Sequence, residues 1–302
     1  MQTMMVTFIT LVAFAANSVL CRWALMDQTI DPLSFSIVRV ISGALTLLIL
    51  LTLSSNSKPK QGSSNSGISV YTKLKSQFQL TSILSLLVYM FGFSFAYLEL
   101  GAGLGALVLF VAVQFTMIAA HLFSGNRMSL IEWCGCLLSV AGLVYLLMPT
   151  ESTQAPDLVS IILMSLAGVG WGIYTLAGKK STNALQSTTA NFGFSSLAIL
   201  VLVSLLLVIP SVASQTSITE QGLIYAILSG SVASGIGYSL WYYVVKKLNT
   251  VVASIAQLSV PVIATLGGVL LLSEPVTMQF VISSTVILLG ISLVLVAPKL
   301  KK

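Results

Sequence analysis

Apolar runs of about twenty residues alternate with short polar segments along most of this chain. A helix rises about 1.5 Å per residue, so a run of that length crosses the ~30 Å hydrocarbon core of a bilayer. The pattern therefore predicts ten membrane-spanning helices. The ten segments are residues 5–25, 33–53, 79–98, 103–123, 129–148, 158–178, 187–209, 221–245, 251–272 and 277–297.

Polar residues at the ends of these runs indicate where helices begin. Asp31 precedes Pro32, a pair that suits a helix cap followed by a proline in the first turn. Ser129 and Glu132 have the spacing of a capping box, and Asp157 is placed to cap the sixth helix. Residues 54–78 include a long Gly- and Ser-rich stretch, which predicts a flexible loop.

Composition supports a membrane environment. Hydrophobic residues make up 56% of the 302 residues and charged residues 7%, against roughly 25% charged residues in a soluble domain. So few charged side chains could not cover the surface of a soluble protein of this length. We therefore expect an all-α polytopic membrane protein.

Basic residues indicate its orientation. Every Lys and Arg except Arg22 and Arg39 lies in the 54–78 loop, in the loops after the fourth, sixth and eighth helices, or after the last helix. The intervening loops carry acidic residues only. By the positive-inside rule, the basic loops and both termini are predicted to be cytoplasmic. The net charge of +6 thus reflects these loops and needs no nucleic-acid partner.

The chain contains a weak internal repeat. The segment that begins at Gly101 aligns with the one that begins at Asn249, and in both copies a helix, a short turn and a second helix with one glycine end at a proline. The repeat unit has five helices, an odd number, so the second copy must be inverted in the membrane. We expect an inverted pair, residues 1–149 and 150–302, an architecture used by secondary transporters with a site near the midplane.

The ninth predicted helix carries an unusual polar stripe. Ser254, Gln257 and Pro261 lie on one side of a helix that is otherwise apolar. Pro261 removes one backbone hydrogen bond and crowds the carbonyl of Gln257, which predicts a kink. Two interpretations stay open: the stripe lines a polar cavity, or it packs against a neighbouring helix.

Arg39 lies about six residues into the second helix, some 9 Å below its outer end. A charge at that depth is costly unless it meets water or a partner. Its side chain either extends to the outer surface or forms a cation in the cavity, able to pair with a substrate carboxylate or with Glu99.

Other polar and aromatic residues fall on helix faces with small neighbours, which is typical of a cavity wall. Trp241 and Tyr242 also suit an aromatic belt at the membrane surface. Together with Arg39, Ser254, Gln257 and Pro261, the candidate cavity residues are Asn17, Tyr89, Gln114, Trp171, Thr175 and Tyr238.

Three residues are candidates for a role in gating or ion coupling: Glu99, His121 and Glu274. For His121 the simpler interpretation is an ordinary hydrogen-bonded residue at a helix end. No acidic residue lies near the middle of a predicted span, so we expect a facilitator or exchanger with little proton coupling unless Glu99 or His121 supplies it. The single histidine, the spacing of the three cysteines and the absence of a phosphate-binding loop predict no metal site, no cofactor and no enzymatic activity.

The sequence resembles the EamA-type domain of the drug/metabolite transporter superfamily. The first half matches loosely, and it departs from the pattern at Val113 and Asn126. The resemblance implies a ten-helix permease of small organic solutes that works as an exporter or exchanger in the bacterial inner membrane, but it names no substrate. We expect the solute to be an amino acid or a related small metabolite. The alternative is a non-transporting membrane assembly module or lipid-carrier subunit. The resemblance rests on Trp171-Gly172, Leu240-Trp241-Tyr242, Gln257 to Pro261, Gly267-Gly268, Leu271 to Pro275, Gly290, Pro32 with Arg39, and Val113 to Thr116.

Overall fold

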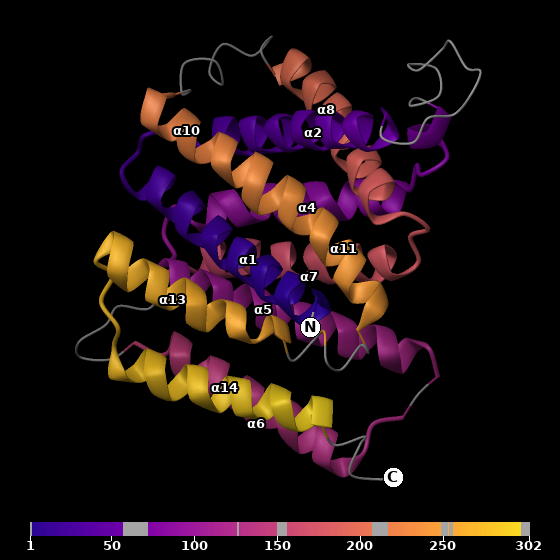
Figure 1. Ribbon diagram of the computed structural model, residues 1–302. Coiled ribbons are helices and arrows are strands. Elements are labelled where there is room, and N and C mark those ends of the chain that lie inside the picture. The colour runs from indigo at the N-terminus through magenta and orange to yellow at the C-terminus, as the bar shows by residue number, and fades with distance from the viewer. Residues whose placement is uncertain are drawn as a thin grey trace.

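A computed structural model describes residues 2–56, 72–125, 127–149, 156–206, 217–248, 253 and 256–296. Within these ranges the chain is helical, and its β-structure is a single isolated bridge between Ile30 and Ile218 (Figure 1). The helices are α1 Gln2–Met26, α2 Pro32–Asn56, α4 Leu80–Ala96, α5 Ala102–Phe123, α6 Leu130–Leu147, α7 Leu158–Lys179, α8 Ala184–Leu206, α10 Glu220–Leu228, η1 Ser229–Ile236, α11 Gly237–Lys247, α13 Ser259–Leu272 and α14 Met278–Val296.

The three predicted helix caps are confirmed. Ser129 and Glu132 form a reciprocal capping box at the start of α6. Asp157 accepts a hydrogen bond from the backbone N of Ser160 at 2.7 Å, and Asp31 accepts one from that of Ser34 at 2.9 Å. These side chains satisfy backbone donors that the first turn of a helix leaves free.

The loop predicted at residues 54–78 begins later than expected and includes a short helical segment before α4 starts at Leu80. Helix α2 continues to Asn56, and residues 72–75 are helical. The remainder of the prediction, residues 57–71, lies outside the described residues.

The eighth predicted helix is continuous over Glu220–Lys247, but its middle third, η1, is a π-helix. π-Helical segments are rare and frequently occur at functional sites, because the wider turn displaces side chains from their α-helical positions. Here the segment contains Ser229 and Ser234, both fully buried.

The ninth helix is not the kinked span predicted over 251–272. A turn at Leu258 separates the helical residues Ala256 and Gln257 from α13, which begins at Ser259. Pro261 therefore lies in the first helical turn, where a missing N–H costs little. The predicted kink is replaced by a break three residues before the proline, and Ser254 lies outside the described residues.

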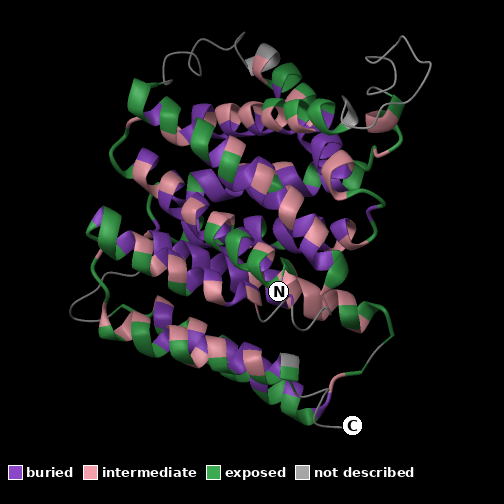
Figure 2. Cartoon of the chain, in the orientation of Figure 1, coloured by how far each residue is buried: buried purple, intermediate pink, exposed green. Residues whose placement is uncertain are grey.

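The chain is a multi-pass membrane protein. Seven helices of the described ranges are long and apolar enough to cross a bilayer, while Leu80–Ala96, Ser259–Leu272 and Met278–Val294 are apolar but shorter. Buried residues concentrate in the central helices, and exposed residues cover the outward faces of the outer ones, including α6 and α14 (Figure 2). Exposed side chains such as Leu137 and Leu289 are apolar, as a lipid-facing surface requires. The predicted number of ten crossings stays a prediction.

Loops assigned to the same side by sequence contact one another. At one end, Thr219 Oγ1 donates to the carbonyl O of Thr29 at 2.9 Å, next to the Ile30–Ile218 bridge. At the other end, the Oε1 atom of Gln77 accepts a hydrogen bond from Ser187 Oγ at 2.8 Å. The two groups of loops are distinct, although which group is cytoplasmic stays a prediction.

Helices α6 and α14 form a tight antiparallel pair at one edge of the molecule (Figure 1). Gly135 faces the carbonyl of Gly290, and Ser139 Oγ donates to the carbonyl of Ile287 at 3.2 Å. Because these are the last helices of the two predicted repeats, an antiparallel pair is what inversion requires. The repeat boundary itself stays a prediction.

Candidate functional site

Arg39 is completely buried, so its side chain does not extend to the outer surface. Its Nε donates to Ser234 Oγ at 2.9 Å, and its Nη2 donates to the hydroxyls of Tyr238 at 2.7 Å and Tyr89 at 3.1 Å. The guanidinium carbon also lies 4.7 Å from the ring centre of Phe93. The outward-extended alternative is therefore wrong, and the cation is part of the interior.

A close approach between α2 and η1 places Arg39 against Ser234. A Cβ atom on Gly230 would lie 2.8 Å from the Cα of Arg39 and closer still to its carbonyl oxygen. Glycine at position 230 is thus what lets the two backbones meet. Arg39 lies seven residues after Pro32, about 10 Å from the start of α2.

The two tyrosines that hold Arg39 belong to a wider hydrogen-bonded network. Their hydroxyl oxygens are 2.7 Å apart. Asn17 Nδ2 donates to Tyr89 at 3.2 Å and to Tyr238 at 3.4 Å, while its Oδ1 accepts a hydrogen bond from Ser229 at 2.5 Å. Asn17, Arg39, Tyr89 and Tyr238, four of the predicted cavity residues, thus lie in direct contact.

Trp171 joins this network to Gln257. The Trp171 ring centre lies 4.6 Å from that of Tyr238 and 5.0 Å from that of Tyr89. Its Nε1 donates to Gln257 Oε1 at 3.2 Å. We use the term arginine site for Arg39 and the buried side chains linked to it: Asn17, Tyr89, Trp171, Ser234, Tyr238 and Gln257.

Sequence reasoning missed one wall of this site. Phe14 of α1 packs edge-on against Trp171 at 5.1 Å, Tyr238 at 5.7 Å and Trp241 at 5.5 Å between ring centres. A lone phenylalanine in an apolar helix gives no signal by itself. Its position three residues before Asn17, one turn away on the same helix face, was the available clue.

The charge of Arg39 has no counter-charge within the described residues. Each acidic residue in those ranges lies at or beyond a helix end. In addition, Arg39 Nη1 and Gln257 Nε2 are buried donors without a hydrogen-bond partner there. The arginine site therefore combines a fully buried cation with two unused donor groups.

The remaining candidates lie elsewhere or in supporting positions. Thr175 is buried and accepts a hydrogen bond from Trp241 Nε1 at 3.3 Å. Gln114 and Pro261 are buried in α5 and α13. Glu99 and His121 are exposed at helix ends, and the described residues contain no ion pair between Glu99 and Arg39.

The aromatic-belt interpretation of Trp241 and Tyr242 is wrong. Trp241 is fully buried and Tyr242 is 1% exposed. The Tyr242 hydroxyl donates to the carbonyl of Tyr174 at 3.0 Å, and Asn191 Nδ2 lies 3.4 Å from the Tyr174 hydroxyl. These residues extend the buried aromatic region from the arginine site toward the end of α11.

Glu274 lies at the opposite end of the molecule from the end of α11. The sequence predicts that this end faces outward. Ser273 has a left-handed backbone with φ of 55°, which ends α13 and turns the chain toward α5. Both carboxylate oxygens of Glu274 then accept from the backbone N of Ala102, at 3.0 and 2.9 Å, and Arg22 Nε lies 3.4 Å away. This carboxylate therefore connects α13, the N-terminus of α5 and α1.

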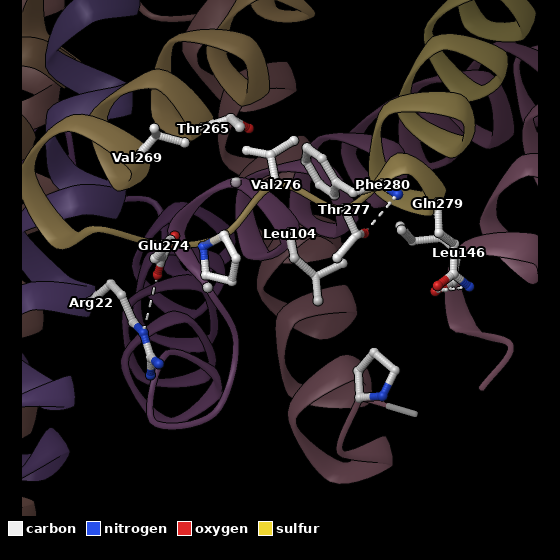
Figure 3. A pocket seen from close by; sticks show the side chains of 14 residues that line it. Arg22, Leu104, Leu146, Thr265, Val269, Glu274, Val276, Thr277, Gln279 and Phe280 are labelled. Atoms are coloured by element: carbon white, nitrogen blue, oxygen red, sulfur yellow. Dashed lines mark hydrogen bonds and ion pairs between the residues drawn. The ribbon is translucent and has the colours of Figure 1, made fainter. Parts of the chain in front are cut away.

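A cavity of about 290 Å³ lies beside this contact (Figure 3). Arg22 and Glu274 line one part of it, and Leu146 and Gln279 line another. The Glu274 contact forms part of the cavity wall, and a role of this residue in gating stays a prediction.

We expect Glu274→Gln to lower the free energy of unfolding by about 1 kcal/mol, because an amide loses the charge that favours a helix N-terminus and Arg22. Thermal unfolding of the detergent-solubilised protein measures this. Glu99→Gln, an equal change at an exposed position, is the matched control and should have no measurable effect. Equal melting temperatures for the two variants would contradict the assignment.

Known proteins resemble this chain, some over nearly its full length and others over more than half of it. The EamA-like transporter family matches residues 1–148 and again residues 158–296. The chain is 39% identical over 299 residues to the uncharacterized protein PA1977 of Pseudomonas aeruginosa, covering 99% of this chain and 96% of that protein. It is 30% identical over 179 residues to the threonine/homoserine exporter RhtA of Escherichia coli, covering 57% of this chain and 56% of the exporter.

A solved crystal structure shares the fold. Its TM-score is 0.63 at 18% sequence identity, with 97% of this chain and 98% of that chain covered. An uncharacterized transporter of Archaeoglobus fulgidus is 28% identical over 194 residues, covering 63% of this chain and 66% of that protein. The resemblance predicted from the sequence is confirmed, and the chain belongs to the EamA-like transporter family.

Proposed function

We propose that this protein is a secondary transporter that exports or exchanges a small carboxylate-bearing solute, an amino acid or a related metabolite, across the bacterial inner membrane. The observation that carries the proposal is the buried charge of Arg39, which has no counter-charge among the residues that the structure describes. Relatives of the chain are transporters, and one is named as an exporter of threonine and homoserine.

The physical argument begins with the cost of burial. Moving a guanidinium out of water costs several kcal/mol even after the protein relaxes. The serine and tyrosine hydroxyls recover part of this cost, but they carry no charge. A bound carboxylate would supply both the negative charge and acceptors for the unused Nη1 donor, since carboxylates match the planar fork of arginine. The site is thus better satisfied with an anionic group than without one.

The position of the site supports alternating access. Asn17, Arg39 and Tyr89 come from the first predicted repeat, while Trp171, Ser234, Tyr238 and Gln257 come from the second. A rocking motion of one half against the other would separate these two sets of residues. Binding and conformational change would therefore be linked at the same contacts.

Reconstitution tests the proposal directly. Purified protein in sealed liposomes, loaded with labelled threonine, homoserine, other amino acids or related carboxylates, should release at least one of them faster than protein-free liposomes do. Saturation at high solute concentration should accompany release, because a binding site limits the rate. A protein that releases none of these solutes would favour the alternative of a membrane assembly module or lipid-carrier subunit.

Proton coupling has a separate expected result. Because the described acidic residues lie at helix ends, we expect transport to continue without a pH gradient. The double variant Glu99→Gln, His121→Ala removes the two groups that sequence analysis nominated for coupling. Strict dependence of transport on a pH gradient in this double variant would contradict the proposed facilitator or exchanger mechanism.

A further inference from the structure

The unused polar atoms of the arginine site share one chemical character. Arg39 Nη1 and Gln257 Nε2 are donors, and both residues are fully buried. The amide orientation of Gln257 follows from its partner, because an indole N–H only donates and must face the oxygen Oε1. The Nε2 group therefore points away from Trp171 as a donor.

Each acceptor of the same site already receives at least one hydrogen bond. Asn17 Oδ1 accepts from Ser229, and Gln257 Oε1 accepts from Trp171. The hydroxyls of Tyr89 and Tyr238 each accept from Arg39 and from Asn17. A ligand group that donates hydrogen bonds would therefore share an acceptor that is already hydrogen-bonded, whereas a group that accepts them finds two buried donors without a partner in the described residues.

Charge leads to the same conclusion. The ammonium of a zwitterionic amino acid would enter a region that already holds one buried cation and, in the described residues, no carboxylate. The aromatic faces of Trp171 and Tyr238 would attract it only weakly compared with an ion pair. A ligand with one negative charge and no ammonium instead neutralises Arg39 and leaves the site without net charge.

We propose that the arginine site selects small monoanionic carboxylates that carry a second acceptor, such as 2-oxo or 2-hydroxy acids, over the zwitterionic amino acids of the same carbon skeleton. The carboxylate binds Arg39, the apolar part lies against Phe14 and Trp171, and the second acceptor binds Gln257 Nε2. This inference rests on the proposed transport function and narrows its substrate class.

Matched solutes test the inference. Liposomes containing the purified protein are loaded at neutral pH with alanine, lactate or pyruvate, and in a second series with leucine and its 2-hydroxy and 2-oxo counterparts. Release from protein-free liposomes is subtracted, because the protonated acids cross lipid unaided. The anions should leave at least about tenfold faster than the amino acids, a difference of ~1.4 kcal/mol. An inside-negative potential should accelerate their release and leave that of the amino acids unchanged.

Variants of Gln257 distinguish selectivity from general loss of function. Gln257→Glu replaces the donor Nε2 with an acceptor and adds the missing negative charge, so the preference should reverse toward the amino acids. Gln257→Leu removes the donor alone, and it should slow the anions without accelerating the amino acids. Gln186→Glu adds the same charge at a half-buried position of α8 outside the arginine site, and it should keep the parent preference.

Three results would overturn the inference. If the parent protein releases the amino acids in preference to their 2-oxo and 2-hydroxy counterparts, selection of monoanions is wrong while the proposed transport function stands. If Gln257→Glu transports with the parent preference, the donor at Gln257 does not set selectivity. Release of neither class by the parent would overturn the proposed function as well.

Discussion

Arg39→Met should abolish most transport while leaving the substrate-free protein folded. Methionine fills a similar volume, and replacing a buried charge by a well-packed apolar side chain is often neutral or stabilising. The loss of a buried partner for a substrate carboxylate costs about 2–5 kcal/mol, which corresponds to at least a ~30-fold slower transport rate at low substrate concentration. Arg39→Lys keeps the charge but loses the planar fork, so an intermediate rate is expected.

Liposome transport and thermal unfolding measure the two halves of this result. Arg127→Met removes an exposed arginine from the loop after α5 and is the matched control, with parent-like transport and stability. If Arg39→Met transports at the parent rate, Arg39 does not bind substrate. If it unfolds well below the parent and loses transport for that reason, the arginine has a structural role instead.

Gly230→Ala should damage the arginine site without changing any of its polar side chains. The added Cβ would lie 2.8 Å from the Cα of Arg39, so the backbones of α2 and η1 must separate. Overpacking of this kind costs about 1–3 kcal/mol. The separation also weakens the 2.9 Å hydrogen bond from Arg39 to Ser234, so both the melting temperature and the transport rate should fall.

Gly193→Ala is the matched control for that variant. A Cβ at position 193 of α8 meets no heavy atom of another part of the structure within 4 Å, and alanine favours helix formation by up to about 1 kcal/mol over glycine. Gly193→Ala should therefore be as stable as the parent or more so. Parent-like stability and transport in Gly230→Ala would show that α2 and η1 can separate without consequence for the site.

The candidate site was only partly predictable from single residues. Arg39 and Gln257 stood out because polar groups are expensive in hydrocarbon, so their presence in apolar runs required a reason. Phe14 gave no such signal, since phenylalanine is ordinary in a membrane helix. The sequence also did not indicate the π-helical segment Ser229–Ile236, because the same residues are compatible with a regular α-helix.

The sequence by itself determined the membrane character, the approximate positions of the helices, their caps and the family. These features depend on local hydrophobicity, on residues within one helical turn, and on motifs along the chain. All of them can be recognised from residues that are close in sequence. Only the tertiary structure decided which polar groups meet. It buried Arg39 against Ser234 of η1 and placed Glu274 on the N-terminus of α5. It also broke the ninth helix at Leu258, so that α13 begins two residues before Pro261. Those outcomes depend on close backbone approach and on competition for hydrogen-bond partners between helices far apart in sequence, which no local pattern records.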